Sequence, residues 1–236
     1  MIKHIFMKVS KVGAFLGILS TCAFASSGFY GGLSLGGAHL SGKHNLHVNR
    51  NSAAGVANPQ NFQANMSDRA MSGEIFAGYE QKVSDLFLGL EAHFGLTRLE
   101  TEALLDISGI NVKRPLNVKS DHGYGAAVHF GYPINPQNRA YVKLGFEIRK
   151  FVSSFRSLNH TGDLLLNHSK TYYSTAFVPG FGIETEVTPI IHLRTEYKIA
   201  LHPAKLHQTI GTNPDRTAIK SKPTVHHVTV GFNVKI

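Results

Sequence analysis

The chain has 236 residues, a formal net charge of +9, a single cysteine and no tryptophan. This length is typical of one domain preceded by a leader. No segment after the leader has the run of roughly 20 apolar residues that a transmembrane helix requires. A membrane form of this chain must therefore be a closed barrel, because lipid offers no hydrogen-bond partner to an open sheet edge.

Residues 1–25 have the features of a secretory signal peptide. Three lysines and no acid accompany the short apolar run 12–19, and Ala23-Phe24-Ala25 is a small-residue cleavage site. Cleavage there removes the only cysteine, so we expect no disulfide, and it lowers the net charge from +9 to +6 by removing three lysines. Export argues against a nucleic-acid partner. It favours lipopolysaccharide phosphates or acidic surface polymers as partners of this basic chain.

Eight later segments alternate apolar and polar residues with a period of two, which is typical of strands. In the clearest, 140–151, hydrocarbon side chains alternate with a set that includes Lys143, Glu147 and Arg149. A soluble barrel would turn the apolar face inward, whereas a membrane barrel turns it toward lipid. In chain order the predicted strands are 29–39, 70–80, 86–97, 121–132, 140–151, 172–185, 190–201 and 225–236.

The predicted connections alternate between long and short. We expect long loops at 40–69, 98–120, 152–171 and 202–224. Short turns are expected at 81–85, 133–139 and 186–189. Long and short connections then fall on opposite ends of an up-and-down meander, as in barrels with short periplasmic turns and long extracellular loops. The sequence therefore predicts an all-β fold, an eight-stranded antiparallel transmembrane barrel, over residues 26–236.

Four stretches give the chain a resemblance to a known family. They are Gly-Phe-Tyr-Gly-Gly-Leu-Ser-Leu-Gly at 28–36, Leu-Phe-Leu-Gly-Leu-Glu-Ala-His-Phe at 86–94, Leu-Arg-Thr-Glu-Tyr-Lys at 193–198 and Val-Gly-Phe-Asn-Val-Lys-Ile at 230–236. With them the chain resembles the eight-stranded outer-membrane barrels of the outer-membrane protein A and opacity-protein type. The resemblance implies a bacterial outer-membrane location and assembly by the barrel-assembly machinery, which reads a terminal aromatic residue. This chain ends in Ile236, which either weakens that assembly signal or makes Phe232 the more important aromatic residue.

Charged residues on the polar faces would point into such a barrel, where isolated charges are costly to desolvate. We expect them to form ion pairs that fill the interior, with a gate of exchanging pairs as the alternative. For Lys143, Glu147 and Arg149, strand order suggests Glu184 and His129 as the nearest partners. Arg194, Glu196 and Lys198 lie one strand further away. The interior candidates are Glu74, Glu91, Lys143, Glu147, Arg149, Glu184, Arg194, Glu196 and Lys198. On the apolar face, candidates for two interfacial aromatic girdles are Tyr79, Tyr124, Tyr132, Tyr173 and Phe232.

The expected role is structural or surface-interacting, in adhesion or envelope integrity, with a plugged interior. The alternatives are a narrow pore or small-ligand carrier and an exported, soluble lipocalin-like binder. Histidines are dispersed over the predicted loops without the spacing of a zinc motif. We therefore expect no catalysis, no cofactor and no metal, and a monomer.

Overall fold

The structure is a computed structural model that describes residues 28–49, 60–106, 113–158, 164–202, 206–210 and 216–236. The predicted signal peptide lies outside these residues. No helix in the described part of the chain is long and apolar enough to cross a membrane. The described strands are β1 (Gly28–Asn49), β2 (Gln60–Val83), β3 (Leu86–Asp106), β4 (Lys113–Pro133), β5 (Asn138–Leu158), β6 (Leu164–Glu186), β7 (Ile191–Leu201), β8 (Leu206–Ile210) and β9 (Arg216–Lys235).

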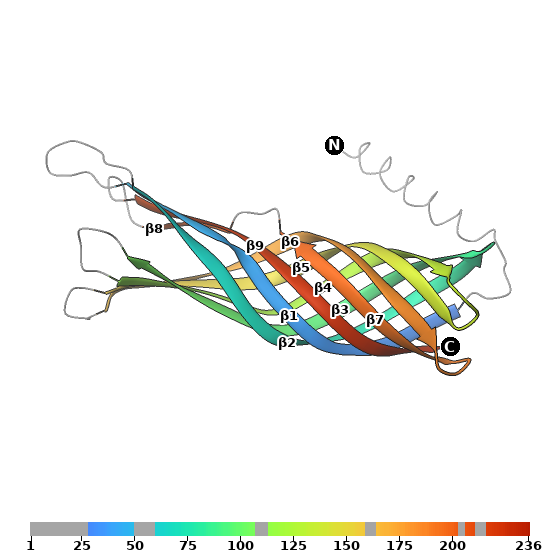
Figure 1. The fold of residues 1–236 in the computed structure, drawn as a ribbon. Helices are drawn as coiled ribbons and strands as arrows, with labels where there is room; N and C mark the ends of the chain where they lie inside the picture. The colour runs from blue at the N-terminus through green and yellow to red at the C-terminus, as the bar shows by residue number, and fades with distance from the viewer. Residues whose placement is uncertain (1–27, 50–59, 107–112, 159–163, 203–205, 211–215) are drawn as a thin grey trace, which may run out of the picture.

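The strands form one antiparallel sheet that closes on itself (Figure 1). Each strand pairs with the next, and β1 pairs with β9 from Tyr30 opposite Lys235 to Asn49 opposite Arg216. Both β7 and β8 pair with β9, at successive heights along it, so together they occupy one position in the wall. The result is a closed eight-stranded barrel, as the sequence predicts.

Side chains alternate between the two faces of the wall. Along β5, Tyr141, Lys143 and Glu147 are buried inside, whereas Val142 and Phe146 are exposed outside. The apolar face therefore points outward and the charged face inward. This arrangement excludes the soluble, lipocalin-like alternative, whose core would be built from those same apolar residues.

Short turns join the strands at one end of the barrel. Ser84 has φ of 57°, in the positive-φ region that a tight hairpin turn requires, and links β2 to β3. Between β4 and β5, the Asn135 side chain accepts hydrogen bonds from the backbone N–H groups of Gln137 and Asn138 at 3.0 and 2.8 Å. Both termini of the described barrel lie at this end too, since Ile236 N donates to Phe29 O at 2.8 Å.

The strands extend well beyond the predicted boundaries at the other end. Most have 20 to 24 residues, whereas about 9–11 suffice to cross a bilayer. The prediction of long loops is therefore wrong for much of 40–69, 98–120, 152–171 and 202–224, where ladder pairing continues. A strand of about 22 residues is roughly 70 Å long. At a tilt of about 40° it rises about 55 Å, twice the apolar band of about 25 Å.

This extension divides into two four-stranded sheets, visible in Figure 1 as two arms remote from the C-terminus. The β2–β3 ladder ends at Ser72 opposite Thr97, and the β6–β7 ladder ends at Phe177 opposite Leu201. We call the sheet β2-β1-β9-β8 arm A and the sheet β3-β4-β5-β6 arm B. Arm A comprises 41–49, 60–68, 206–210 and 216–224, and arm B comprises 98–106, 113–120, 152–158 and 164–176.

An apolar core fills the interior at the base of the two arms, where they separate. Leu99 and Phe151 are fully buried there, and Leu40, Val118 and Val225 join them from other strands. These inward positions continue the same alternation that carries charges lower in the barrel. The interior thus changes from ionic to hydrocarbon along its axis.

Candidate functional site

The candidate site is the charged interior of the barrel. The inward row of β5 passes through all of its levels, in the order Tyr141, Lys143, Glu147, Arg149. Each of these side chains is at most 6% exposed. Because a buried charge is costly without a partner, the neighbouring strands must supply opposite charges at each level.

At the central level two acids and two bases form a closed cluster. Lys143 Nζ lies 2.5 Å from Glu91 Oε1 and 3.2 Å from Glu196 Oε1. Arg194 Nη1 lies 2.5 Å from Glu91 Oε2, and its Nη2 pairs with Glu196. The four formal charges cancel, so burial of this cluster leaves no net charge.

Two tyrosines complete the central cluster. Tyr30 donates its hydroxyl to Glu91 at 3.0 Å, and Tyr141 donates to Glu196 at 2.9 Å while accepting from Arg194 Nε at 2.6 Å. Their rings lie over glycines: a Cβ at Gly78 would overlap Tyr30, and one at Gly182 would overlap Tyr141.

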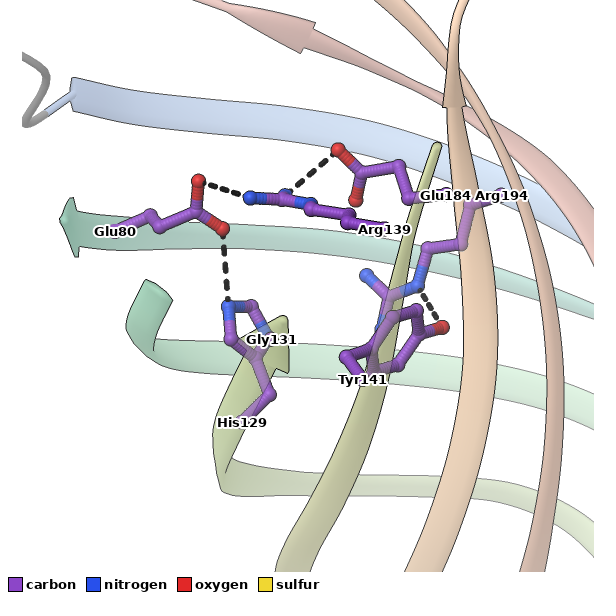
Figure 2. A pocket seen from close by; sticks show the side chains of 7 residues that line it. All are labelled: Glu80, His129, Gly131, Arg139, Tyr141, Glu184 and Arg194. Atoms are coloured by element: carbon purple, nitrogen blue, oxygen red, sulfur yellow. Dashed lines mark hydrogen bonds and ion pairs between the residues drawn. The ribbon is translucent and has the colours of Figure 1, made fainter. Parts of the chain in front are cut away.

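A second cluster lies at the short-turn end, where a small pocket opens (Figure 2). The Arg139 guanidinium bridges two carboxylates, with 2.5 Å to Glu80 Oε1 and 2.7 Å to Glu184 Oε1. His129 Nε2 lies 3.4 Å from Glu80, and His192 Nδ1 lies 3.2 Å from Glu184. Arg139 therefore crosses the mouth and holds carboxylates from two different strands.

A third cluster lies on the arm side of the central one. Arg149 Nε pairs with Glu147 Oε1 at 2.7 Å, and Arg149 Nη2 lies 3.4 Å from His227 Nε2. The imidazole of His93 is 3.6 Å from Glu147. Lys198 pairs with Glu74 across the lumen. Above this cluster, the apolar core closes the ionic part of the interior.

All nine predicted interior residues point inward and belong to these ion pairs. The nearest partners inferred from strand order, Glu184 and His129, are wrong, however, whereas Glu196 from one strand further away does pair with Lys143. Lys143 pairs with Glu91 and Glu196, because its long side chain reaches past the adjacent strand, and Glu147 pairs with Arg149 on its own strand. Whether any of these pairs exchanges as a gate stays a prediction.

Several interior residues lie outside the predicted set, chiefly Glu80, Arg139, Tyr30 and Tyr141. The period of two could have found three of them, since Tyr30, Glu80 and Tyr141 occupy inward positions. Arg139 fell inside the predicted turn 133–139 because the strand begins at Asn138, earlier than expected. In the described residues, no group of three His, Cys, Asp or Glu side chains could hold a metal ion.

The predicted aromatic residues all lie on the outer wall and are between 37% and 65% exposed. Tyr79, Tyr132 and Phe232 are near the short-turn end of the exposed apolar band, and Tyr124 and Tyr173 are near its arm end. Ile236 ends the chain beside β1 and is 90% exposed. The role of the five aromatic residues as interfacial girdles stays a prediction. The role of Phe232 and Ile236 in assembly also stays a prediction.

The barrel has an apolar exterior and a charged interior, and its sheet closes without a free edge in the part that crosses the membrane. These features define a bacterial outer-membrane β-barrel. The model of the family described as outer membrane protein beta-barrel domain matches residues 12–235. The chain belongs to this family and is a protein of the bacterial outer membrane. No curated protein sequence matches it.

Solved structures show the same fold at low sequence identity. OprG from Pseudomonas aeruginosa is 12% identical with a TM-score of 0.53, and the match covers 87% of this chain and 95% of OprG. The outer membrane protease OmpT from Escherichia coli is 10% identical with a TM-score of 0.51, over 92% and 99% of the two chains. Neisserial surface protein A is 18% identical with a TM-score of 0.43, over 89% and 99%. At identities this low, OprG and OmpT show the fold alone.

Proposed function

We propose that this protein is a surface-interaction barrel whose arms bind an acidic polymer outside the cell. The observation that carries the proposal is the pair of four-stranded arms on the long-connection end, which is the extracellular end in barrels of this type. A barrel that only spanned the membrane would need about half of this strand length.

The charge pattern of arm A supports an acidic partner. Lys43 and Lys222 are exposed and directly opposite each other across β1 and β9, and Lys220 is exposed two residues further along β9. Like charges directly opposite in a sheet are destabilising. A polyanion lying along this face would relieve the repulsion.

The interior supports a closed barrel with no catalytic role. Glu91 and Glu196 are neutralised by Lys143 and Arg194 instead of facing an open pocket. Above the ion pairs, the apolar core around Leu99 would impede ions further. We therefore propose a plugged interior that supports the wall and does not conduct.

The binding test uses cells that display the protein and fluorescent heparin as the polyanion. We expect Lys43→Gln with Lys222→Gln to lower binding at least about fivefold at physiological salt. The matched control is Lys150→Gln with Lys170→Gln, which removes two charges from β5 and β6 on the other side of the barrel. Equal binding by both double variants would refute a polyanion site on arm A.

A narrow pore is the second candidate, favoured by the ionic lining of the lumen. Planar-bilayer recording separates the two roles. The closed interior predicts no channel events above the bare-membrane baseline in 1 M KCl. Regular ion-selective openings that disappear after heat unfolding would support the pore instead.

A further inference from the structure

Three basic side chains form a row across the outer wall, where the exposed apolar band gives way to arm A. His39 on β1 lies directly opposite Arg69 on β2 and opposite His226 on β9. The row is therefore fixed by the register of three adjacent strands. It belongs to the outward face, so the bases are separate from the interior ion pairs.

The next outward row toward the membrane is apolar and has a gap at its centre. Gly37 lies between Met71 on β2 and Val228 on β9, which are 81% and 54% exposed. A Cβ built on Gly37 would meet nothing within 4 Å. The missing side chain leaves an open pocket whose lining includes both rows.

The two imidazoles of the basic row are held in place. His39 Nδ1 is 3.0 Å from the Asp68 carbonyl oxygen, and His226 Nδ1 is 2.8 Å from the Tyr197 hydroxyl. The two imidazole rings lie 6.1 Å apart. The nearby Asp68 carboxylate accepts from the backbone N–H groups of Arg69 and Glu100, at 2.8 and 2.6 Å. That acid is thus engaged at the β2–β3 junction.

We propose that this pocket binds one phosphorylated lipid of the outer leaflet, with the phosphate against the basic row and an acyl chain over Gly37. Arg69 supplies the planar donor fork that suits phosphate, and the histidines supply further ring nitrogens. The apolar row is continuous with the exposed apolar band of the outer wall, which favours a lipid over a free anion. The site requires only the outer-membrane location and is independent of polyanion binding by arm A.

The test counts lipids bound to the purified, folded barrel by native mass spectrometry in neutral detergent. The probes are diphosphorylated lipid A, its fully dephosphorylated counterpart and inorganic phosphate. We expect one diphosphorylated lipid A per barrel, at least tenfold weaker retention of the dephosphorylated lipid, and no displacement by 10 mM inorganic phosphate. Displacement by inorganic phosphate, or equal retention of both lipids, would overturn the proposal.

Two variants address the two halves of the pocket separately. Arg69→Gln removes the donor fork, and Gly37→Leu fills the gap without touching a charge. We expect each to weaken diphosphorylated lipid A binding at least fivefold, while Lys82→Gln at the short-turn end has no effect. Heat-modifiable migration in detergent gels verifies that each variant is folded before it is scored. Unchanged binding in folded Arg69→Gln and Gly37→Leu would assign the bound lipid to another surface.

Discussion

Lys143 Nζ and Glu91 Oε1 are 2.5 Å apart inside the barrel, although one residue is on β5 and the other on β3. Strand β4 lies between β3 and β5, and its residue Ala127 is directly opposite Glu91. That small side chain leaves room for the lysine to reach across β4. The pair therefore ties together two strands that share no backbone hydrogen bonds.

Replacing Lys143 by Met should destabilise the barrel strongly. Glu91 and Glu196 would then share Arg194 alone, and the cluster would carry a buried net negative charge. We expect the free energy of unfolding to fall by about 3 kcal/mol, measured by urea titration in lipid vesicles. Adding Glu91→Gln restores neutrality and should recover part of the loss. A double variant no more stable than Lys143→Met would contradict the charge-balance account.

Gly182→Ala should be damaging because the new methyl group would overlap Tyr141 and the carbonyl oxygen of Thr195. Overpacking of this kind costs about 1–3 kcal/mol. The matched control is Gly37→Ala, since that Cβ enters open space, and we expect a change within about 0.5 kcal/mol. Unfolding midpoints of the two variants give the comparison. Equal destabilisation would show that strand glycines matter here for reasons other than interior space.

Hydrogen exchange distinguishes rigid arms from loops. Residues 152–157 of β5 are paired with β4 or β6 along arm B. Their amides should exchange about 100-fold more slowly than in an unfolded chain, which corresponds to local opening at roughly 3 kcal/mol. The measurement is peptide-resolved exchange in lipid nanodiscs, with the protein unfolded in denaturant as the reference. Exchange as fast as in the unfolded reference would mean that arm B is not a stable sheet.

The aromatic residue of the last strand offers a test of assembly. Phe232 lies on β9, is exposed on the outer wall and is the candidate residue for recognition by the barrel-assembly machinery. We expect Phe232→Ala to lower the folded fraction in the outer membrane about twofold. Phe181→Ala is the control, because Phe181 is another exposed aromatic of the outer wall. The folded fraction is measured in membrane extracts by its migration without boiling.

The period-two pattern was sufficient to predict the closed barrel and the inward direction of all nine charged candidates. Its success has a simple cause: successive strand residues must point to opposite faces, and only one face of each segment is compatible with lipid. The same rule placed Tyr124 and Phe232 outside.

Strand length and ion-pair partners could not be obtained in this way. The pattern weakens beyond the membrane because both faces of an arm can be polar. The ladder from Val152 to Leu158 shows no alternation of apolar and polar residues, although it is paired throughout. Partners depend on side-chain reach across the lumen. Arg139 links Glu80 and Glu184 from strands that are distant in sequence, and strand order alone carries no information about such crossings.

The two arms are expected to form at different stages of folding. Arm B is made of four consecutive strands, so it can grow hairpin by hairpin from local contacts. Arm A contains the contact between the first and last strands, where Val48 faces Thr217. Such distant pairings close late because they require the largest chain loops. The proposed lipid pocket spans the same first-to-last junction, so it cannot exist until the final strand is in place.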